Sequence, residues 1–283
     1  MKKVLLGMTA LAFFAASCKD DKSGIVTPDP PKTEDWYLTG IVVRDIDNSG
    51  ATFGDKDSMV MTYNTDKTFN TLEEIAGENE TYYALVKFIY NQQKVTKMTL
   101  QESKMGVAET IYECTYSGDQ LVRFFEPGRS ATSYDSLVYE NNKVVKVFQV
   151  RADKRNNKSW EYTWQNNNVT EAREFNANPT TYNLELVSIR KYTYNNVANP
   201  YKSLANFLLM KGDNPDIPLL SANEQMSYTV ANAQNVVSHI YNYTRSANDK
   251  GLTVADTMWH KTPAESSAKA DYISAYKYTD LNK

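Results

Sequence analysis

The chain has few residues that could cross-link it, coordinate a metal or catalyse a reaction. Its 283 residues include two cysteines, Cys18 and Cys114, and two histidines, His239 and His260. Two histidines without a cysteine or HExxH partner do not form a recognisable zinc site, so we expect ordinary sheet histidines and no metal. The eleven glycines are mostly isolated, and no nucleophile-elbow, phosphate-loop or dinucleotide motif occurs. The sequence therefore predicts no catalytic residue and no cofactor.

The chain also lacks an excess of basic residues: 31 lysines and arginines stand against 34 acidic residues, and the formal net charge is −3. Without a basic excess, nucleic acid is not an expected partner. The N-terminal uncharged run, Val4 to Ala16, is only thirteen residues long, whereas a membrane-spanning helix needs about 20. With Lys2 and Lys3 before it and small residues after it, this run has the features of a secretory signal peptide.

Three small residues, Ala15, Ala16 and Ser17, directly precede Cys18. This sequence resembles the lipobox read by lipoprotein signal peptidase, with Ala15 in place of the usual leucine. The resemblance implies a signal peptide over 1–17 and a lipid on Cys18 that attaches the protein to a membrane. The alternative is a plain secretory signal with an incidental cysteine.

Charged residues follow the cysteine at once. Lys19, Asp20 and Asp21 resemble the surface-export signal of Bacteroidota lipoproteins, which implies display on the outer face of the outer membrane. The alternative is an ordinary charged linker. Residues 18–35 are polar and proline-containing, cannot bury a core, and are predicted to be a flexible tether.

A six-residue unit recurs through the middle of the chain: an aromatic residue, four polar or turn-forming residues, then an aliphatic residue. The aromatic residues stand 26, 23 and 25 residues apart, in Tyr90–Val95, Tyr116–Leu121, Tyr139–Val144 and Trp164–Val169. Asn, Gly and Asp tolerate the positive φ of hairpin turns. The repeat therefore predicts consecutive hairpins in one all-β domain over 36–283, an antiparallel meander that is curled or barrel-like. The units weaken after Asn195, and the sequence does not decide between a closed barrel and an open sheet.

Aromatic residues alternate with polar ones along the expected strands, as in Trp160, Tyr162 and Trp164. Such a stripe lies on one face of a sheet, and it suits either a half-buried core face or a groove for a flat ligand or glycan. Cys114 lies between Tyr112 and Tyr116 at strand spacing, so we expect a small buried hydrophobic residue. One short helix is predicted near 200–211, as a plug or lid against the sheet.

These features together resemble a family of Bacteroidota surface lipoproteins built from tyrosine-rich hairpins, which has been likened to porins and to RHS repeats. The resemblance implies location and fold but no chemistry, because the family has no established activity. The expected strands carry Lys87, Glu113, Arg123 and Glu161 without a clear lipid-facing apolar band, so a membrane-spanning barrel is not expected.

Two weaker motifs remain. Asp45, Asp47, Ser49 and Gly50 match the first half of a calcium loop, but Lys56 occupies the position of its closing acid. Three tripeptides resemble the O-glycosylation sequon of exported Bacteroidota proteins, and Ser58 and Thr257 are better candidate acceptors than Ser136, which is expected in mid-strand.

The leading hypothesis is a lipid-anchored, surface-displayed, non-enzymatic binding or structural lipoprotein. The first alternative is a module that captures a glycan or cofactor for an outer-membrane transporter, with the tyrosines facing the ligand. The second alternative is a hydrolase, since carboxylate pairs for glycoside hydrolysis are not recognisable in a single sequence.

Overall fold

The computed structural model describes residues 36–46, 52–76, 82–151, 153, 155–210 and 215–282, with backbone only for residues 52–56. The chain divides into two compact units, Met1–Pro31 and Lys32–Lys283, and all described residues belong to the second. Among them, no helix has the length and apolar character that crossing a bilayer requires.

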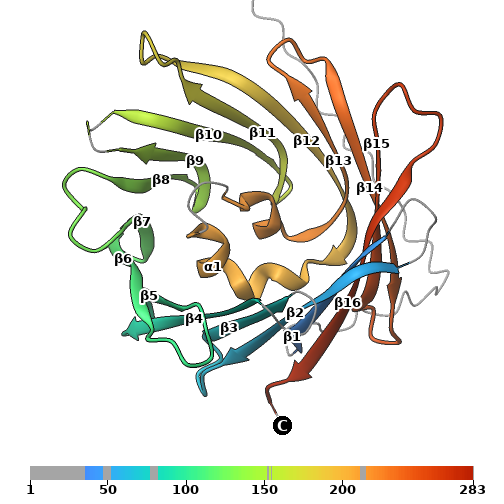
Figure 1. The fold of residues 1–283 in the computed structure, drawn as a ribbon, viewed down its shortest axis with the longest axis horizontal. Coiled ribbons are helices and arrows are strands. Elements are labelled where there is room, and N and C mark those ends of the chain that lie inside the picture. Colours follow the sequence, from blue (N-terminus) through green and yellow to red (C-terminus); the bar gives the residue numbers. More distant parts are fainter. Residues whose placement is uncertain are drawn as a thin grey trace, which may run out of the picture. The chain divides into compact units, whose positions relative to one another are not determined.

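Sixteen strands within the described residues form one closed antiparallel barrel, in which each strand pairs with its neighbours in sequence and β1 pairs with β16. The predicted all-β meander is thus confirmed, and it closes (Figure 1). The strands are β1 (Trp36–Ile46), β2 (Thr52–Tyr63), β3 (Phe69–Ala76), β4 (Tyr82–Asn91), β5 (Lys94–Gln101), β6 (Glu109–Ser117), β7 (Gln120–Phe125), β8 (Tyr134–Glu140), β9 (Lys143–Val150), β10 (Asn156–Gln165), β11 (Asn168–Ala177), β12 (Leu184–Ala198), β13 (Asn223–Asn232), β14 (Val237–Ala247), β15 (Thr253–Lys261) and β16 (Lys269–Asp280).

The predicted tight turns are present at the repeated units. Asn141 and Asn142 adopt φ values of 50° and 61°, and Asn166 and Asn167 adopt 49° and 63°. Positive φ at both central residues is the geometry of a type I′ hairpin turn, whose twist matches that of the flanking strands. Gly118, at φ 57°, serves the corresponding turn between β6 and β7. The residues at these turns therefore favour tight hairpins, and consecutive hairpins produce the meander.

Each aromatic residue of the repeat forms a hydrogen bond to the preceding hairpin. The Tyr139 hydroxyl donates to the carbonyl oxygen of Leu121 at 2.9 Å, and the Trp164 indole N–H donates to that of Val144 at 2.7 Å. Tyr63, Tyr194 and Tyr278 donate in the same way to backbone carbonyl oxygens 25 residues distant, at 2.7, 2.7 and 2.8 Å. We call this series the aromatic ladder; it explains why an aromatic residue with a polar tip recurs at each turn.

Side chains alternate between the barrel interior and its outer wall. On β4, Ala84, Val86 and Phe88 are buried, whereas Lys87 and Ile89 are exposed. Val86 and Phe88 belong to a core cluster whose residues come from β1 to β5, β7 to β11, β16 and the connection between β12 and β13. Cys114 belongs to its edge, with its Sγ 3.4 Å from the Sδ of Met210. Cys114 packs against the core as expected, but it is half-buried and not buried as predicted.

The connection between β12 and β13 turns into the barrel instead of forming a hairpin. It contains the 3-10 helix η3 (Pro200–Leu204), the helix α1 (Ala205–Leu209) and the 3-10 helix η4 (Ile217–Leu220), and Figure 1 shows it within the ring of strands. We call the described residues of this connection, 199–210 and 215–222, the plug. The predicted helix near 200–211 and its role as a plug are confirmed.

Candidate functional site

The two ends of the plug are fixed to each other and to the barrel wall. The side-chain amide of Asn199 donates to the carbonyl oxygens of Leu219 and Ser221, at 2.6 and 2.9 Å, and its oxygen caps η3 by accepting from the Tyr201 amide at 3.0 Å. The Ser221 hydroxyl, fully buried, accepts from the backbone amide of Val169 at 3.0 Å. Buried polar groups satisfied in this way hold one conformation, so the plug is a fixed part of the interior.

The plug leaves two adjoining cavities inside the barrel, of about 500 and 520 Å³. Both volumes lie in the range of small-molecule sites. Cavity 1 lies between the plug and β1 to β3 and β13 to β16, and cavity 2 lies between η4 and β10 to β14. Asp216, Pro218, Leu219, Gln225 and Tyr243 line both, so the two cavities meet at η4.

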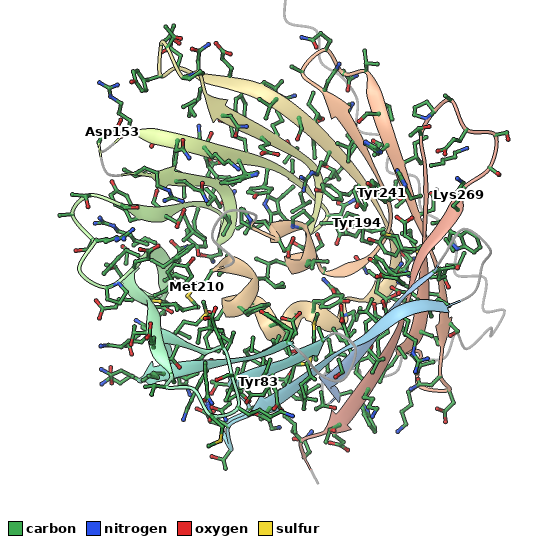
Figure 2. All side chains as sticks on the ribbon, viewed as in Figure 1. Tyr83, Asp153, Tyr194, Met210, Tyr241 and Lys269 are labelled. Atoms are coloured by element: carbon green, nitrogen blue, oxygen red, sulfur yellow. The ribbon has the colours of Figure 1, made fainter. Side chains whose placement is uncertain are left out.

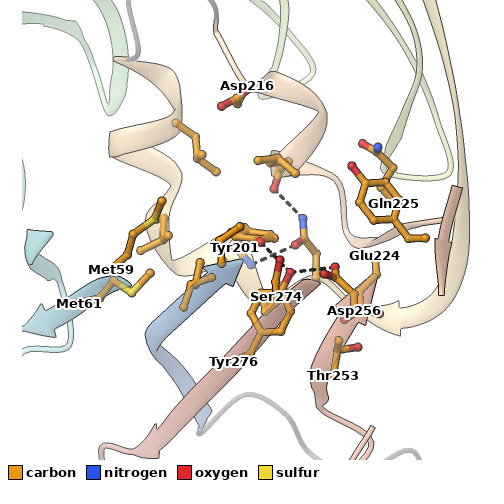
Figure 3. A pocket seen from close by; sticks show the side chains of 18 of the residues that line it. Met59, Met61, Tyr201, Asp216, Glu224, Gln225, Thr253, Asp256, Ser274 and Tyr276 are labelled. Carbon is orange, nitrogen blue, oxygen red and sulfur yellow. Dashed lines mark hydrogen bonds between the residues drawn. The ribbon is translucent and has the colours of Figure 1, made fainter. Parts of the chain in front are cut away.

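Cavity 1 has an apolar side and a charged side (Figure 3). Residues such as Met59, Met61 and Leu208 form the apolar side. On the charged side, Arg245 Nε lies 3.7 Å from Glu224 Oε2 and 3.8 Å from Asp256 Oδ2. One guanidinium thus holds two carboxylates, each of which is 3% exposed at its side chain.

Asp256 is the centre of a hydrogen-bonded chain of side chains. The Tyr276 hydroxyl donates to Asp256 Oδ2 at 2.9 Å, and the hydroxyls of Tyr201 and Tyr276 lie 3.1 Å apart. Burial raises the pKa of the Asp256 carboxyl, against the lowering effects of Tyr276, Arg245 and the nearby Ser274 hydroxyl. The second carboxylate oxygen, Oδ1, is buried and has no hydrogen-bond partner among the described residues. An acceptor left unpaired in this way is costly unless something else binds it.

Cavity 2 is lined by aromatic residues. Tyr192, Tyr228, Tyr241 and His260 lie on four neighbouring strands and form a column, with successive ring centroids 5.9, 4.3 and 4.6 Å apart. Figure 2 shows Tyr241, together with Tyr194 and Met210, toward the middle of the barrel. The ring faces contact each other, so a ligand in cavity 2 would meet ring edges and hydroxyls.

Two further polar groups lie in cavity 2, on the inner face of β10. They belong to Trp160 and Tyr162, which are 4% and 6% exposed. Within the described residues, neither Trp160 Nε1 nor the Tyr162 hydroxyl has a hydrogen-bond partner. Burial also keeps the Tyr162 hydroxyl protonated, with its pKa well above the usual value. Both groups are therefore available as donors.

The two histidines, far apart in sequence, are brought together across β14 and β15. His239 Nδ1 and His260 Nε2 lie 2.9 Å apart. The expectation of sheet histidines holds in that both lie in strands, but their pairing was missed. The sequence feature that could have predicted this pairing is the turn near Asp249. A hairpin there places Tyr241 opposite His260 and so brings His239, two residues before Tyr241, close to His260.

Other predicted site residues lie elsewhere. Cys18, Lys19, Asp20 and Asp21 lie outside the described residues, as does Asp47 of the calcium loop, whereas Asp45 lies on β1. The three glycosylation candidates all lie in strands: Ser58 on β2, Ser136 on β8 and Thr257 on β15. The contrast drawn between Ser136 and the other two therefore disappears, and glycosylation stays a prediction.

The fold and site define a class: a closed antiparallel barrel with an internal plug and two interior cavities. Neither a protein-family model nor a curated protein matches the chain. Among solved structures, a porin-like protein from Bacteroides uniformis is similar with 9% identity and a TM-score of 0.57, covering 88% of this chain and 99% of that one. A porin-like protein from Bacteroides vulgatus is similar with 11% identity and a TM-score of 0.40, covering 86% and 99%. At this identity the first likeness shows the fold alone.

Proposed function

We propose that this protein is a non-enzymatic, lipid-anchored barrel of the outer membrane that binds a small ligand in its interior. The observation that carries the proposal is a set of buried polar atoms around the cavities that have no hydrogen-bond partner among the described residues: Trp160 Nε1, the Tyr162 hydroxyl and Asp256 Oδ1. An unsatisfied buried donor or acceptor costs roughly 1–3 kcal/mol. A ligand that satisfies these atoms would recover that cost, whereas a purely structural barrel gains nothing from them.

The wall of the barrel supports attachment by a lipid over insertion into a bilayer. Cross-strand ion pairs, Lys97 with Glu113 at 3.2 Å and Lys146 with Glu161 at 2.6 Å, lie on the strand faces opposite the buried core. A membrane-spanning barrel has the reverse arrangement, apolar outside and polar inside. The lipid on Cys18 would then hold a water-facing barrel at the membrane, and the porin-like description of the Bacteroides uniformis protein favours the outer membrane.

Two variants test the anchor and the display. Cys18→Ala should leave an unlipidated precursor that stays out of the detergent phase, and labelling of that variant with radioactive palmitate would contradict the anchor. Replacing Asp20 and Asp21 with alanine should retain the lipid but abolish protease shaving on intact cells. Unchanged shaving would mean that these acids are an ordinary linker.

A more specific candidate is capture of a glycan, favoured by the donors and aromatic edges of cavity 2. A glycan array run beside a hydrolysis screen tests it on the purified protein. Binding without turnover, lost in Trp160→Phe and Tyr162→Phe, supports a capture module. Turnover of any array member would replace the proposal with a hydrolase.

A further inference from the structure

We propose that cavity 1 selects an organic cation, an amine with an apolar body, through Asp256. This inference rests on the proposed function, in that it assigns a ligand class to one of the two interior cavities. It arises from the charge of the cavity, the apolar side opposite, and the oxygen of Asp256 that has no partner in the described part of the chain.

The charge of the cavity is strongly one-sided. Two buried carboxyl side chains, those of Glu224 and Asp256, lie on its charged side, and the only cationic side chain among its described lining residues is that of Arg245. Because Arg245 is shared between Glu224 and Asp256, one guanidinium faces two buried acids. A ligand carboxylate or phosphate would add a negative charge to this group, whereas an ammonium would offset the excess.

Asp256 supplies the specific contact. It is 4% exposed, its Oδ2 accepts from Tyr276 and lies beside Arg245, and its Oδ1 has no partner among the described residues. An ammonium N–H donating to Oδ1 would complete the carboxylate with a charge-assisted hydrogen bond, about twice as strong as a neutral one. A hydroxyl could also donate there, but without the charge.

The rest of the cavity fits the remainder of such a ligand. Tyr201, Tyr243, Tyr272 and Tyr276 surround the charged side, and tyrosine rings attract cations through their faces. The apolar side, formed by residues such as Met59 and Met61, would bury a hydrocarbon or aromatic body. The cavity of about 500 Å³ thus has the polarity of an amphipathic amine.

Three probes of similar size and different charge test the inference: 2-phenylethylamine, 2-phenylethanol and phenylacetate. Each is titrated into the full chain with ¹³C-methyl-labelled methionine. Met59 and Met61 report cavity 1, and Met105, which is 96% exposed, serves as the internal control. We expect the amine to shift the Met59 and Met61 signals and to bind at least about tenfold more tightly than the alcohol, with phenylacetate weakest.

Asp256→Asn keeps the shape of the side chain and removes its charge, so it should weaken amine binding about tenfold and leave the alcohol unchanged. Asp135→Asn is the matched control, because Asp135 is equally buried, pairs with Arg151 and lies away from both cavities. If Asp256→Asn does not fold, the relative affinities of the unmodified protein for the three probes still test the cation assignment.

Equal binding of amine and alcohol, or tightest binding of phenylacetate, would overturn the cation assignment while leaving an interior binding site in place. Absence of any methionine shift with all three probes would also overturn it. The proposed function is then decided separately by the glycan array, since that screen reports on cavity 2.

Discussion

The Tyr139 hydroxyl donates to the carbonyl oxygen of Leu121, the second residue after the preceding hairpin turn, at 2.9 Å. Tyr139 is itself paired across its own turn with Val144, whose carbonyl oxygen accepts from Trp164. Each hairpin of the aromatic ladder is thus fastened to the one before it by a side chain. The six-residue unit recurs in the sequence because this hydrogen bond recurs at each hairpin.

Tyr139→Phe should lower the free energy of unfolding by about 1 kcal/mol, because the Leu121 carbonyl loses its side-chain donor in a partly buried site. Tyr182→Phe is the control, since Tyr182 is 51% exposed and should change stability by less than about 0.5 kcal/mol. Urea midpoints of the two variants and the parent measure both effects. Equal midpoints for the two variants would contradict a stabilising role of the aromatic ladder.

The hairpins were predictable because their signals are local. A two-residue turn with Asn141 and Asn142 needs only those residues and the alternation beside them. Even so, a plain two-residue hairpin would pair Val138 with Val145, whereas a β-bulge next to the turn places Val138 opposite Lys146. Each bulge adds twist, and no residue pattern near the turn announces it.

Closure and the cavities depend on contacts between distant residues. Trp36 lies opposite Asp280 in the β1–β16 pair, a register fixed by the sum of all the intervening hairpins. The same holds for Asp256: Arg245 and Tyr276 contact it from two other strands, and Tyr201 joins the chain of side chains through Tyr276. The sequence indicated the tyrosine face but could not separate ladder residues such as Tyr139 from cavity residues such as Tyr228.

Proline at the second turn position should be costly. Asn142 and Asn167 adopt φ values of 61° and 63°, which glycine accepts and the proline ring, fixed near −65°, does not. Asn142→Pro and Asn167→Pro should each lose about 3 kcal/mol, and the glycine variants at the same sites should stay near the parent. Urea midpoints of all four variants give the result, and proline tolerated at both sites would mean that these turns are open loops.

Removing the Tyr162 hydroxyl should raise the free energy of unfolding, whereas removing that of Tyr139 should lower it. The Tyr162 hydroxyl is buried without a partner among the described residues, so Tyr162→Phe should stabilise the ligand-free protein by about 1 kcal/mol. Thermal and urea unfolding of the two Phe variants side by side test this. A loss equal to that of Tyr139→Phe would show that the hydroxyl is already satisfied in the absence of a ligand.

Tyrosine ionisation should limit stability at high pH. Burial raises the pKa of Tyr63, Tyr116 and Tyr194 from 10.0 to about 12 in each case. A raised folded-state pKa gives stability that is complete below the unfolded value and is lost as the pH rises through the folded one. The urea midpoint should therefore fall between pH 10 and 12, and phenolate absorbance should rise later in the native protein than in urea. Coincident absorbance curves would contradict the burial of these rings.

The most direct test of interior ligand binding uses the indole N–H signals of the four tryptophans in ¹⁵N-labelled protein. Trp160 Nε1 has no partner among the described residues, whereas those of Trp164 and Trp259 donate to Val144 and to Thr244. Titration with the oligosaccharides and small molecules retained by the array should shift the Trp160 signal strongly and leave those of Trp164 and Trp259 in place. A retained compound that leaves the Trp160 signal unmoved and shifts those of the other tryptophans would contradict binding inside the barrel.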